Sequence, residues 1–114
     1  MKISKIAEIL EGTFICREDL KDKEVTSACG SDMMSDVLAY VKDQAVLITG
    51  LCNPQVVRTA EMMDMVCIVF VRGKQPSQAM IDLAKERGIV MITTPRRMFS
   101  ACGLLYTSGL IPGN

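Results

Sequence analysis

The chain alternates between apolar runs and polar segments that contain glycine or proline, and it opens with a helical pattern. Within the first twelve residues, apolar side chains recur at the 3.6-residue period of an amphipathic helix, namely at Ile3, Ile6, Ala7, Ile9 and Leu10. Gly12 is expected to end this helix. A short strand over residues 13–16, a charged loop over residues 17–24 and a second short strand over residues 25–27 are expected to follow.

A second helical pattern begins near residue 31. Ser31 and Asp32 are both suitable N-caps, because their side-chain oxygens can accept hydrogen bonds from the free N–H groups of a helix's first turn. The face expected to be buried consists of Met33, Met34, Val37, Leu38 and Val41. This spacing predicts an amphipathic helix that ends near residue 41.

From residue 45 onward, uninterrupted apolar runs alternate with helical segments. The runs lie at residues 45–49, 66–71 and 89–93. Because these runs have no polar face, they predict strands that are buried on both sides in a parallel sheet.

The helical segments between and after these runs are marked by boundary residues. Helices are expected over residues 54–64, 76–87 and 96–108, and the first two begin with a proline at a position where proline is well tolerated. Asn53 is the expected N-cap of the first of them. Gly88 is expected to end the second.

The whole succession predicts a three-layer α/β domain with a mainly parallel sheet. The length of 114 residues suits one domain with a sizeable core. Since no linker or low-complexity segment divides the chain, this domain is expected over residues 1–110. Residues 111–114 are expected to be a loose tail.

Composition narrows the classes of function. Lys plus Arg and Asp plus Glu each number 13, so the formal net charge is zero, which argues against a general nucleic-acid binder. The chain contains no histidine, the usual general base and a common metal ligand. We therefore expect neither an enzyme nor a metal or cofactor site.

No apolar stretch approaches the ~20 residues of a membrane span, and the charged N-terminus is unlike a signal peptide. A cytoplasmic location is expected.

The five cysteines are widely spaced, and none forms a Cys-x-x-Cys pair. Reduced thiols that behave as small apolar side chains are the expected state. Cys52 lies just before the helix that begins at Pro54, where the helix dipole would lower the pKa of its thiol and allow redox sensing. The alternative is that Cys52 is an unreactive turn residue.

Three strand ends carry the candidate chemistry. In an open α/β sheet, ligands bind beyond the carboxyl ends of the strands, and helix N-termini there favour anions. Arg96 and Arg97 follow the last strand and add positive charge. The candidate ligand-binding residues are Thr49, Gly50, Asn53, Arg72, Gly73 and Lys74. The alternative is that the glycines and prolines serve only as turn residues.

Adjacent methionines suggest a partner surface. Met62 and Met63 point about 100° apart on a helix and cannot both face one sheet. A helical face formed by Val56, Ala60 and Met63 is therefore a candidate interface for a two-fold dimer. The alternative is that these side chains fill the core.

Four of these segments together resemble a known family. They are the helix over residues 3–10, the helix over residues 31–38, the strand end Leu47-Ile-Thr-Gly50 and the segment 69–76. Over residues 1–107 they resemble a DRTGG domain, and they look closest to the small stand-alone members found near iron hydrogenase genes. The positions that match the family pattern are Thr49, Gly50, Gly73 and Pro76. Where the family has Asp-Arg, this chain has Leu51-Cys52, and where it has Thr-Gly-Gly, this chain has Val71-Arg72-Gly73.

The resemblance implies a fold related to the N-terminal domain of HPr kinase/phosphorylase. In that family the domain is regulatory or dimer-forming rather than catalytic. This chain is accordingly expected to be a non-catalytic regulatory or sensory domain that binds a small anionic ligand, such as a nucleotide, at the strand ends. The alternative is a homodimeric interaction module that assists the assembly or regulation of a redox enzyme of the hydrogenase type.

Overall fold

The computed structural model describes residues 1–41 and 44–113, which fold around a six-stranded sheet in the order β1-β5-β4-β3-β2-β6. The strands are β1 (Thr13–Cys16), β2 (Ser27–Gly30), β3 (Ala45–Thr49), β4 (Cys67–Phe70), β5 (Val90–Thr93) and β6 (Ile111–Pro112). The helices are α1 (Ile3–Ile9), α2 (Met34–Tyr40), α3 (Pro54–Met62), α4 (Gln78–Arg87) and α5 (Met98–Thr107), with a short 3-10 helix at Glu18–Leu20.

The sheet is parallel except at one edge. Strands β5, β4, β3, β2 and β6 run in one direction, and only β1 pairs antiparallel, with β5. Every residue of β3 and β4 is buried, because helices cover both faces of the sheet. The prediction of a mainly parallel sheet is therefore confirmed.

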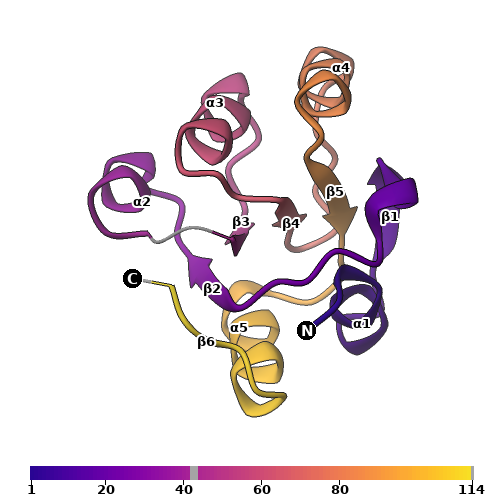
Figure 1. Ribbon diagram of the computed structural model, residues 1–114, viewed down its shortest axis with the longest axis vertical. Helices are drawn as coiled ribbons and strands as arrows, with labels where there is room; N and C mark the ends of the chain where they lie inside the picture. The colour runs from indigo at the N-terminus through magenta and orange to yellow at the C-terminus, as the bar shows by residue number, and fades with distance from the viewer. Residues whose placement is uncertain (42–43, 114) are drawn as a thin grey trace.

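The helices form two layers around the sheet (Figure 1). Helices α2, α3 and α4 lie on one side, and α1 and α5 lie on the other. Alternate residues of β3 supply both cores: Leu47 packs in the core with α2–α4, whereas Val46 and Ile48 pack in the core with α1 and α5. The three-layer α/β architecture is confirmed.

Local capping places the helices of the first layer. The Asn53 Oδ1 accepts a hydrogen bond from Gln55 N at 2.9 Å, so the predicted N-cap of α3 is confirmed. Helix α4 begins two residues later than expected, because the Ser77 Oγ accepts from Met80 N at 3.3 Å and takes the capping role. Gly88 ends α4 in the left-handed conformation (φ 71°), as predicted.

The segment around α2 differs from the prediction. The second strand covers Ser27–Gly30 instead of residues 25–27. Neither Ser31 nor Asp32 caps α2; the N-cap position is Met33, whose side chain makes no capping bond. Of the five residues predicted to be buried here, Met34, Val37 and Val41 are buried, whereas Met33 (61% exposed) and Leu38 (38% exposed) are not.

The end of the chain is also different from the prediction. Ile111 and Pro112 form β6, which pairs with β2, and Gly113 is buried and donates its N–H to Ala28 O at 2.8 Å. Residues 111–113 of the predicted tail are therefore not loose, and residue 114 lies outside the described residues. The reason is that β2 would otherwise be an edge strand with unpaired backbone groups, which this segment covers.

The helix face expected to seal a dimer is used inside the molecule. Val56 and Ala60 are fully buried in the core between α3 and the sheet, and Met63 packs against the same core. This predicted dimer face is wrong, because the sheet itself covers it. Met62 points outward instead and is 71% exposed.

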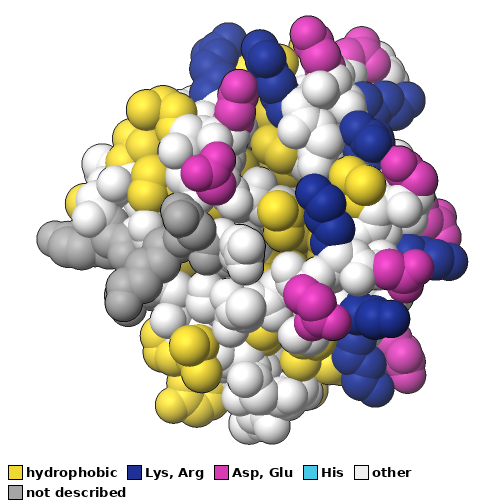
Figure 2. All heavy atoms as spheres, in the orientation of Figure 1, with side chains coloured by type: hydrophobic (Ala, Val, Ile, Leu, Met, Phe, Trp, Pro, Cys, Tyr) yellow, Lys and Arg dark blue, Asp and Glu magenta, His cyan; other side chains and the backbone are white. Residues whose placement is uncertain are grey.

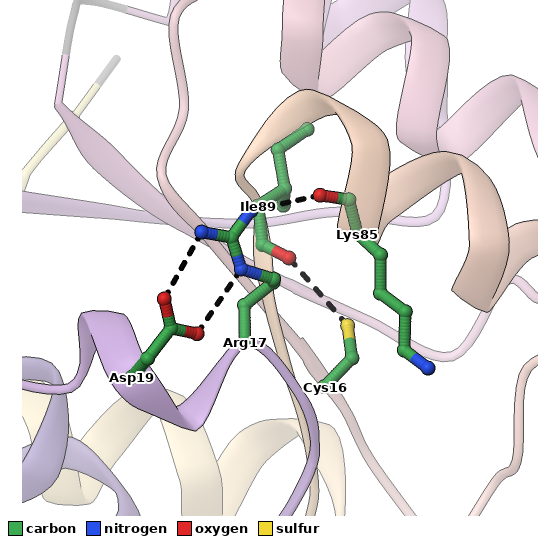
Figure 3. A network of polar contacts seen from close by, with 5 residues as sticks. All are labelled: Cys16, Arg17, Asp19, Lys85 and Ile89. Atoms are coloured by element: carbon green, nitrogen blue, oxygen red, sulfur yellow. Dashed lines mark hydrogen bonds and ion pairs between the residues drawn. The ribbon is translucent and has the colours of Figure 1, made fainter.

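A polar network ties β1 to the end of α4 (Figure 3). The Arg17 guanidinium makes two bonds to the Asp19 carboxylate, at 3.1 and 3.0 Å, and its Nη1 donates to Lys85 O at 2.8 Å. The Cys16 thiol donates to Ile89 O at 3.6 Å. These contacts supply partners for carbonyl groups at and after the end of α4, so we assign the network a structural role.

No helix of the described residues is long and apolar enough to cross a membrane.

Candidate ligand site at the strand ends

Asp32 holds the carboxyl end of β3. One oxygen of its carboxylate, Oδ1, accepts from the Thr49 Oγ1 at 3.0 Å and from Gly50 N at 2.7 Å. The Thr49 Oγ1 in turn accepts from Leu51 N at 3.1 Å. Thr49 is fully buried, so Asp32 satisfies a hydroxyl group that solvent does not reach. The N–H of Gly50 is thus already bonded, and it does not face an open site.

A tight turn follows β4 and carries two cations. Lys74 N donates to Val71 O at 3.2 Å across this turn. The two central residues, Arg72 (φ 58°) and Gly73 (φ 65°), both have positive φ, which is the geometry of a type I′ turn. Glycine suits this backbone, whereas an arginine adopts it rarely.

The turn is fixed to the end of β5. Arg72 N donates to Arg96 O at 2.8 Å, and Gly73 N donates to Thr94 O at 2.7 Å. The Thr93 Oγ1 donates to Lys74 O at 2.9 Å. Because these backbone groups are all paired, a ligand here would meet the side chains of the turn rather than its N–H groups.

The Arg72 side chain joins the ends of β3 and β4. A Cβ added to Gly50 would lie 2.6 Å from the Arg72 Nη2, so the guanidinium packs directly over the Gly50 backbone. A glycine is required at this position for that close approach. The structure therefore brings together Asp32, Thr49, Gly50, Arg72 and Lys74, and we call this group the strand-end site.

Cys52 lies within the electrostatic range of the same group. Burial raises the pKa of the Cys52 thiol, the nearby Lys74 charge lowers it, and the Asp32 carboxylate raises it. The net direction is upward. This direction is opposite to the one expected for a thiol activated by the helix dipole, because desolvation outweighs the favourable charge of Lys74.

Asn53 contributes to the position of α3 rather than to an open surface. Its Oδ1 is taken up by the capping bond to Gln55 N. Among the sequence-predicted residues, Thr49 and Gly50 both bind the Asp32 carboxylate, and Gly50 also contacts the Arg72 guanidinium. Gly73 shapes the turn that presents Arg72.

A hollow of about 500 Å³ opens beside the strand-end site. We call it the β4–β5 hollow; its lining residues are Arg72, Pro95, Arg97, Met98 and Phe99. Arg72 is therefore shared between the strand-end site and this hollow. Of the two arginines that follow β5, only Arg97 lines it, since the Arg96 Nη2 lies 3.5 Å from the Glu11 Oε1 and is paired with the end of α1.

The described residues offer little for metal or thiolate chemistry. No three Cys, Asp or Glu side chains in residues 1–41 and 44–113 lie close enough to share a metal ion. Burial raises the pKa of the other four thiols as well, those of Cys16, Cys29, Cys67 and Cys102. The arrangement is suited to binding an anion through guanidinium and ammonium groups.

Sequence reasoning missed Asp32 and Phe99. Asp32 was interpreted as a helix cap because the preceding strand was placed too early; once β2 ends at Gly30, Asp32 falls at the same sheet edge as Thr49. Phe99 falls within the helix expected over residues 96–108, and the sequence pattern assigns it no role of its own. Its position directly after two arginines is the signal that could have marked it.

Comparison with known proteins identifies the family. The model of the DRTGG domain matches residues 5–108. The chain belongs to the DRTGG family. This confirms the family that the sequence resembles. No curated protein matches this chain.

Among solved structures, this DRTGG domain is similar to the CBS and DRTGG domains of the regulatory region of Clostridium perfringens pyrophosphatase. That region was complexed with its activator, diadenosine tetraphosphate. The TM-score is 0.80 at 19% sequence identity, so the likeness is one of fold. The match covers 96% of this chain and 48% of that one, so this chain spans about half of its length.

Proposed function

We propose that this DRTGG domain is a non-catalytic regulatory domain that binds a small anionic ligand, with a nucleotide as the expected class, at the carboxyl ends of β3 and β4. The observation that carries the proposal is the Arg72 guanidinium, which lies over Gly50 and also lines the β4–β5 hollow. Lys74 from the same turn and Arg97 across the hollow add positive charge. In a chain of zero net charge, this local concentration of cations favours an anion.

The strand-end site also limits which groups bind the ligand. The N–H groups of Gly50, Arg72 and Gly73 are already paired within the chain. Binding is therefore expected to depend on the side chains of Arg72, Lys74 and Arg97, and to weaken as salt concentration rises.

The test is a binding measurement by calorimetry with nucleoside triphosphates, inorganic pyrophosphate and inorganic tripolyphosphate. Arg72→Ala should weaken binding at least about tenfold, because a charge-assisted hydrogen bond contributes about 1.5–3 kcal/mol. The matched control is Arg87→Ala, which removes the same charge from an exposed pair with Glu61 (3.4 Å) at the far end of α4. Equal affinities of the two variants and the unaltered chain would show that the site lies elsewhere.

A second variant tests whether anion binding can be weakened without a loss of stability. Gly50→Ala places a methyl group against the end of the Arg72 side chain, which can move at small cost to stability. Anion affinity should fall while the melting temperature stays nearly the same. A large loss of stability without a change in affinity would contradict this account of Gly50.

We infer a second candidate function from the face formed by α5 and β6. Tyr106 (67% exposed) and Ile111 (61% exposed) are unusual on a surface, and residues 98–114 contain no charged side chain. Figure 2 shows hydrophobic side chains gathered over α5 and β6, at the lower left. This face supports a homodimeric interaction module; a redox enzyme of the hydrogenase type, whose assembly or regulation the module would assist, is proposed as the partner from the family resemblance alone.

This candidate is tested by sedimentation. A dimer is expected at micromolar protein concentration, and Tyr106→Glu should dissociate it by placing two like charges in the interface. A monomer at every concentration, or a dimer that Tyr106→Glu leaves intact, would contradict the assignment. Binding of a purified iron hydrogenase, measured with the unaltered chain and with Tyr106→Glu, tests the proposed partner.

A further inference from the structure

Phe99 is the most exposed of the large hydrophobic side chains among the described residues, at 90% exposed. It lies in the first turn of α5, where none of residues 1–41 and 44–113 covers it. Phe99 also lines the wall of the β4–β5 hollow. A ligand in this hollow that covered the ring would gain affinity, because burial of such a side chain is favourable.

The hollow lies where the sheet connections diverge. Strand β4 leads into α4, whose Met80 and Ala84 pack in one core, whereas β5 leads into α5, whose Ala101 and Leu105 pack in the other. Neighbouring parallel strands whose connections leave toward opposite faces create a crevice at their carboxyl ends. Such crevices are common ligand sites in α/β proteins.

The walls of the hollow are held in place before any ligand arrives. The turn that carries Arg72 is bonded to the segment after β5 through Arg96 O (2.8 Å) and Thr94 O (2.7 Å). Arg97 and Phe99 follow that segment directly. The two arginines and the aromatic ring therefore have a fixed backbone relationship, which reduces the entropy that a ligand must overcome.

The chemistry of the hollow is mixed. Arg72 and Arg97 offer guanidinium groups that match phosphate oxygens, and Phe99 and Met98 offer an apolar wall. A bare inorganic anion would use only the arginines. A ligand that carries both phosphate and a flat aromatic group would use the arginines and the ring together. The volume of about 500 Å³ is within the range of small-molecule sites.

We propose that Phe99 is the platform on which the base of a nucleotide stacks, with its phosphates on Arg72 and Arg97. This rests on the proposed anion site and narrows its ligand to a phosphate that bears an aromatic base. Stacking of a base on an aromatic side chain changes affinity by roughly 5- to 150-fold. Recognition through a π-face selects for a base without selecting strongly between purines and pyrimidines.

The absence of tryptophan from the sequence provides a direct reporter. Phe99→Trp introduces a single indole at the wall of the hollow. Titration with ATP, GTP or UTP is expected to quench its fluorescence, because the base stacks on the ring. Inorganic tripolyphosphate, which has the charge without the base, is expected to leave the fluorescence nearly unchanged while it binds.

The affinity test uses Phe99→Ala with Tyr106→Ala as the matched control. Both residues are exposed aromatics of α5, and only Phe99 lines the hollow. Phe99→Ala should weaken ATP binding roughly 5- to 150-fold and leave tripolyphosphate binding unchanged. Tyr106→Ala should change neither. Because both side chains are exposed, both variants are expected to fold, and thermal unfolding verifies this.

The outcomes separate this inference from the proposed function. If tripolyphosphate and ATP bind equally well to the unaltered chain, the anion site stands and the platform role of Phe99 is refuted. If ATP binds better but Phe99→Ala does not weaken it, the platform is again refuted. If no phosphate compound binds, both proposals fail. If Phe99→Ala alters only the oligomeric state, Phe99 belongs to a protein interface instead.

Discussion

Removal of the Asp32 carboxylate is the sharpest test of how the strand-end site is built. Asp32→Ala leaves the Thr49 hydroxyl and the Gly50 N–H without their shared acceptor. Each hydrogen bond to a charged group contributes about 1.5–3 kcal/mol to stability. Asp32 itself is exposed, so water can replace part of the loss. We therefore expect a decrease in the free energy of unfolding of about 2–4 kcal/mol.

This free energy converts into a measurable change in melting temperature. An unfolding entropy of about 2.1 cal/mol/K per residue gives about 0.24 kcal/mol/K for 114 residues. The expected decrease is therefore about 8–17 °C. Calorimetry or circular dichroism on heating measures it, and urea unfolding gives the free energy independently.

Two comparisons show whether the contact of Asp32 with Thr49 and Gly50 causes the expected loss of stability. Asp36→Ala removes an equivalent charge from the exposed first turn of α2 and should cost under about 1 kcal/mol. Asp32→Ala combined with Thr49→Val should show a coupling energy of about 0.5–3 kcal/mol, since the two side chains share a bond of 3.0 Å. Equal effects of Asp32→Ala and Asp36→Ala, with additive energies in the double variant, would refute the role assigned to Asp32.

Two further predictions concern positions away from the site. Gly103→Ala should raise stability by about 0.5–1 kcal/mol, because an added Cβ in the middle of α5 meets no atom within 4 Å; an unchanged or lower melting temperature would contradict this. The Arg17 hydrogen bond holds the pKa of the Asp19 carboxyl below its ordinary value, so Asp19 contributes stability above that value and loses it as the pH falls through the folded-state pKa. Asp19→Asn should therefore be less stable than the unaltered chain at pH 7, and the difference should close below about pH 4; a difference that persists at low pH would point to another cause.

The sequence by itself determined the central part of the fold. The strands β3, β4 and β5 are buried on both faces, and such strands consist of apolar runs that are visible without any partner. The cap at Asn53 and the helix end at Gly88 follow from local backbone chemistry in the same way. Since these strands are parallel, their carboxyl ends had to meet at one edge, and this is why Thr49 and Arg72 were recognised as candidates.

Tertiary structure decided which strands form the edges of the sheet and which contacts hold the strand-end site together. Strand β2 consists of small residues and β6 has only two residues, so neither has a strong hydrophobic pattern. They form because the backbone groups of each strand pair with those of the other. Asp32 reaches the end of β3 only because β2 lies beside it, across 17 residues of sequence. The contact of Arg72 with Gly50 has the same origin. The local sequence pattern indicates which side chains are buried. Contacts between distant segments depend instead on how the layers of the fold pack together, and this packing exists only in the folded chain.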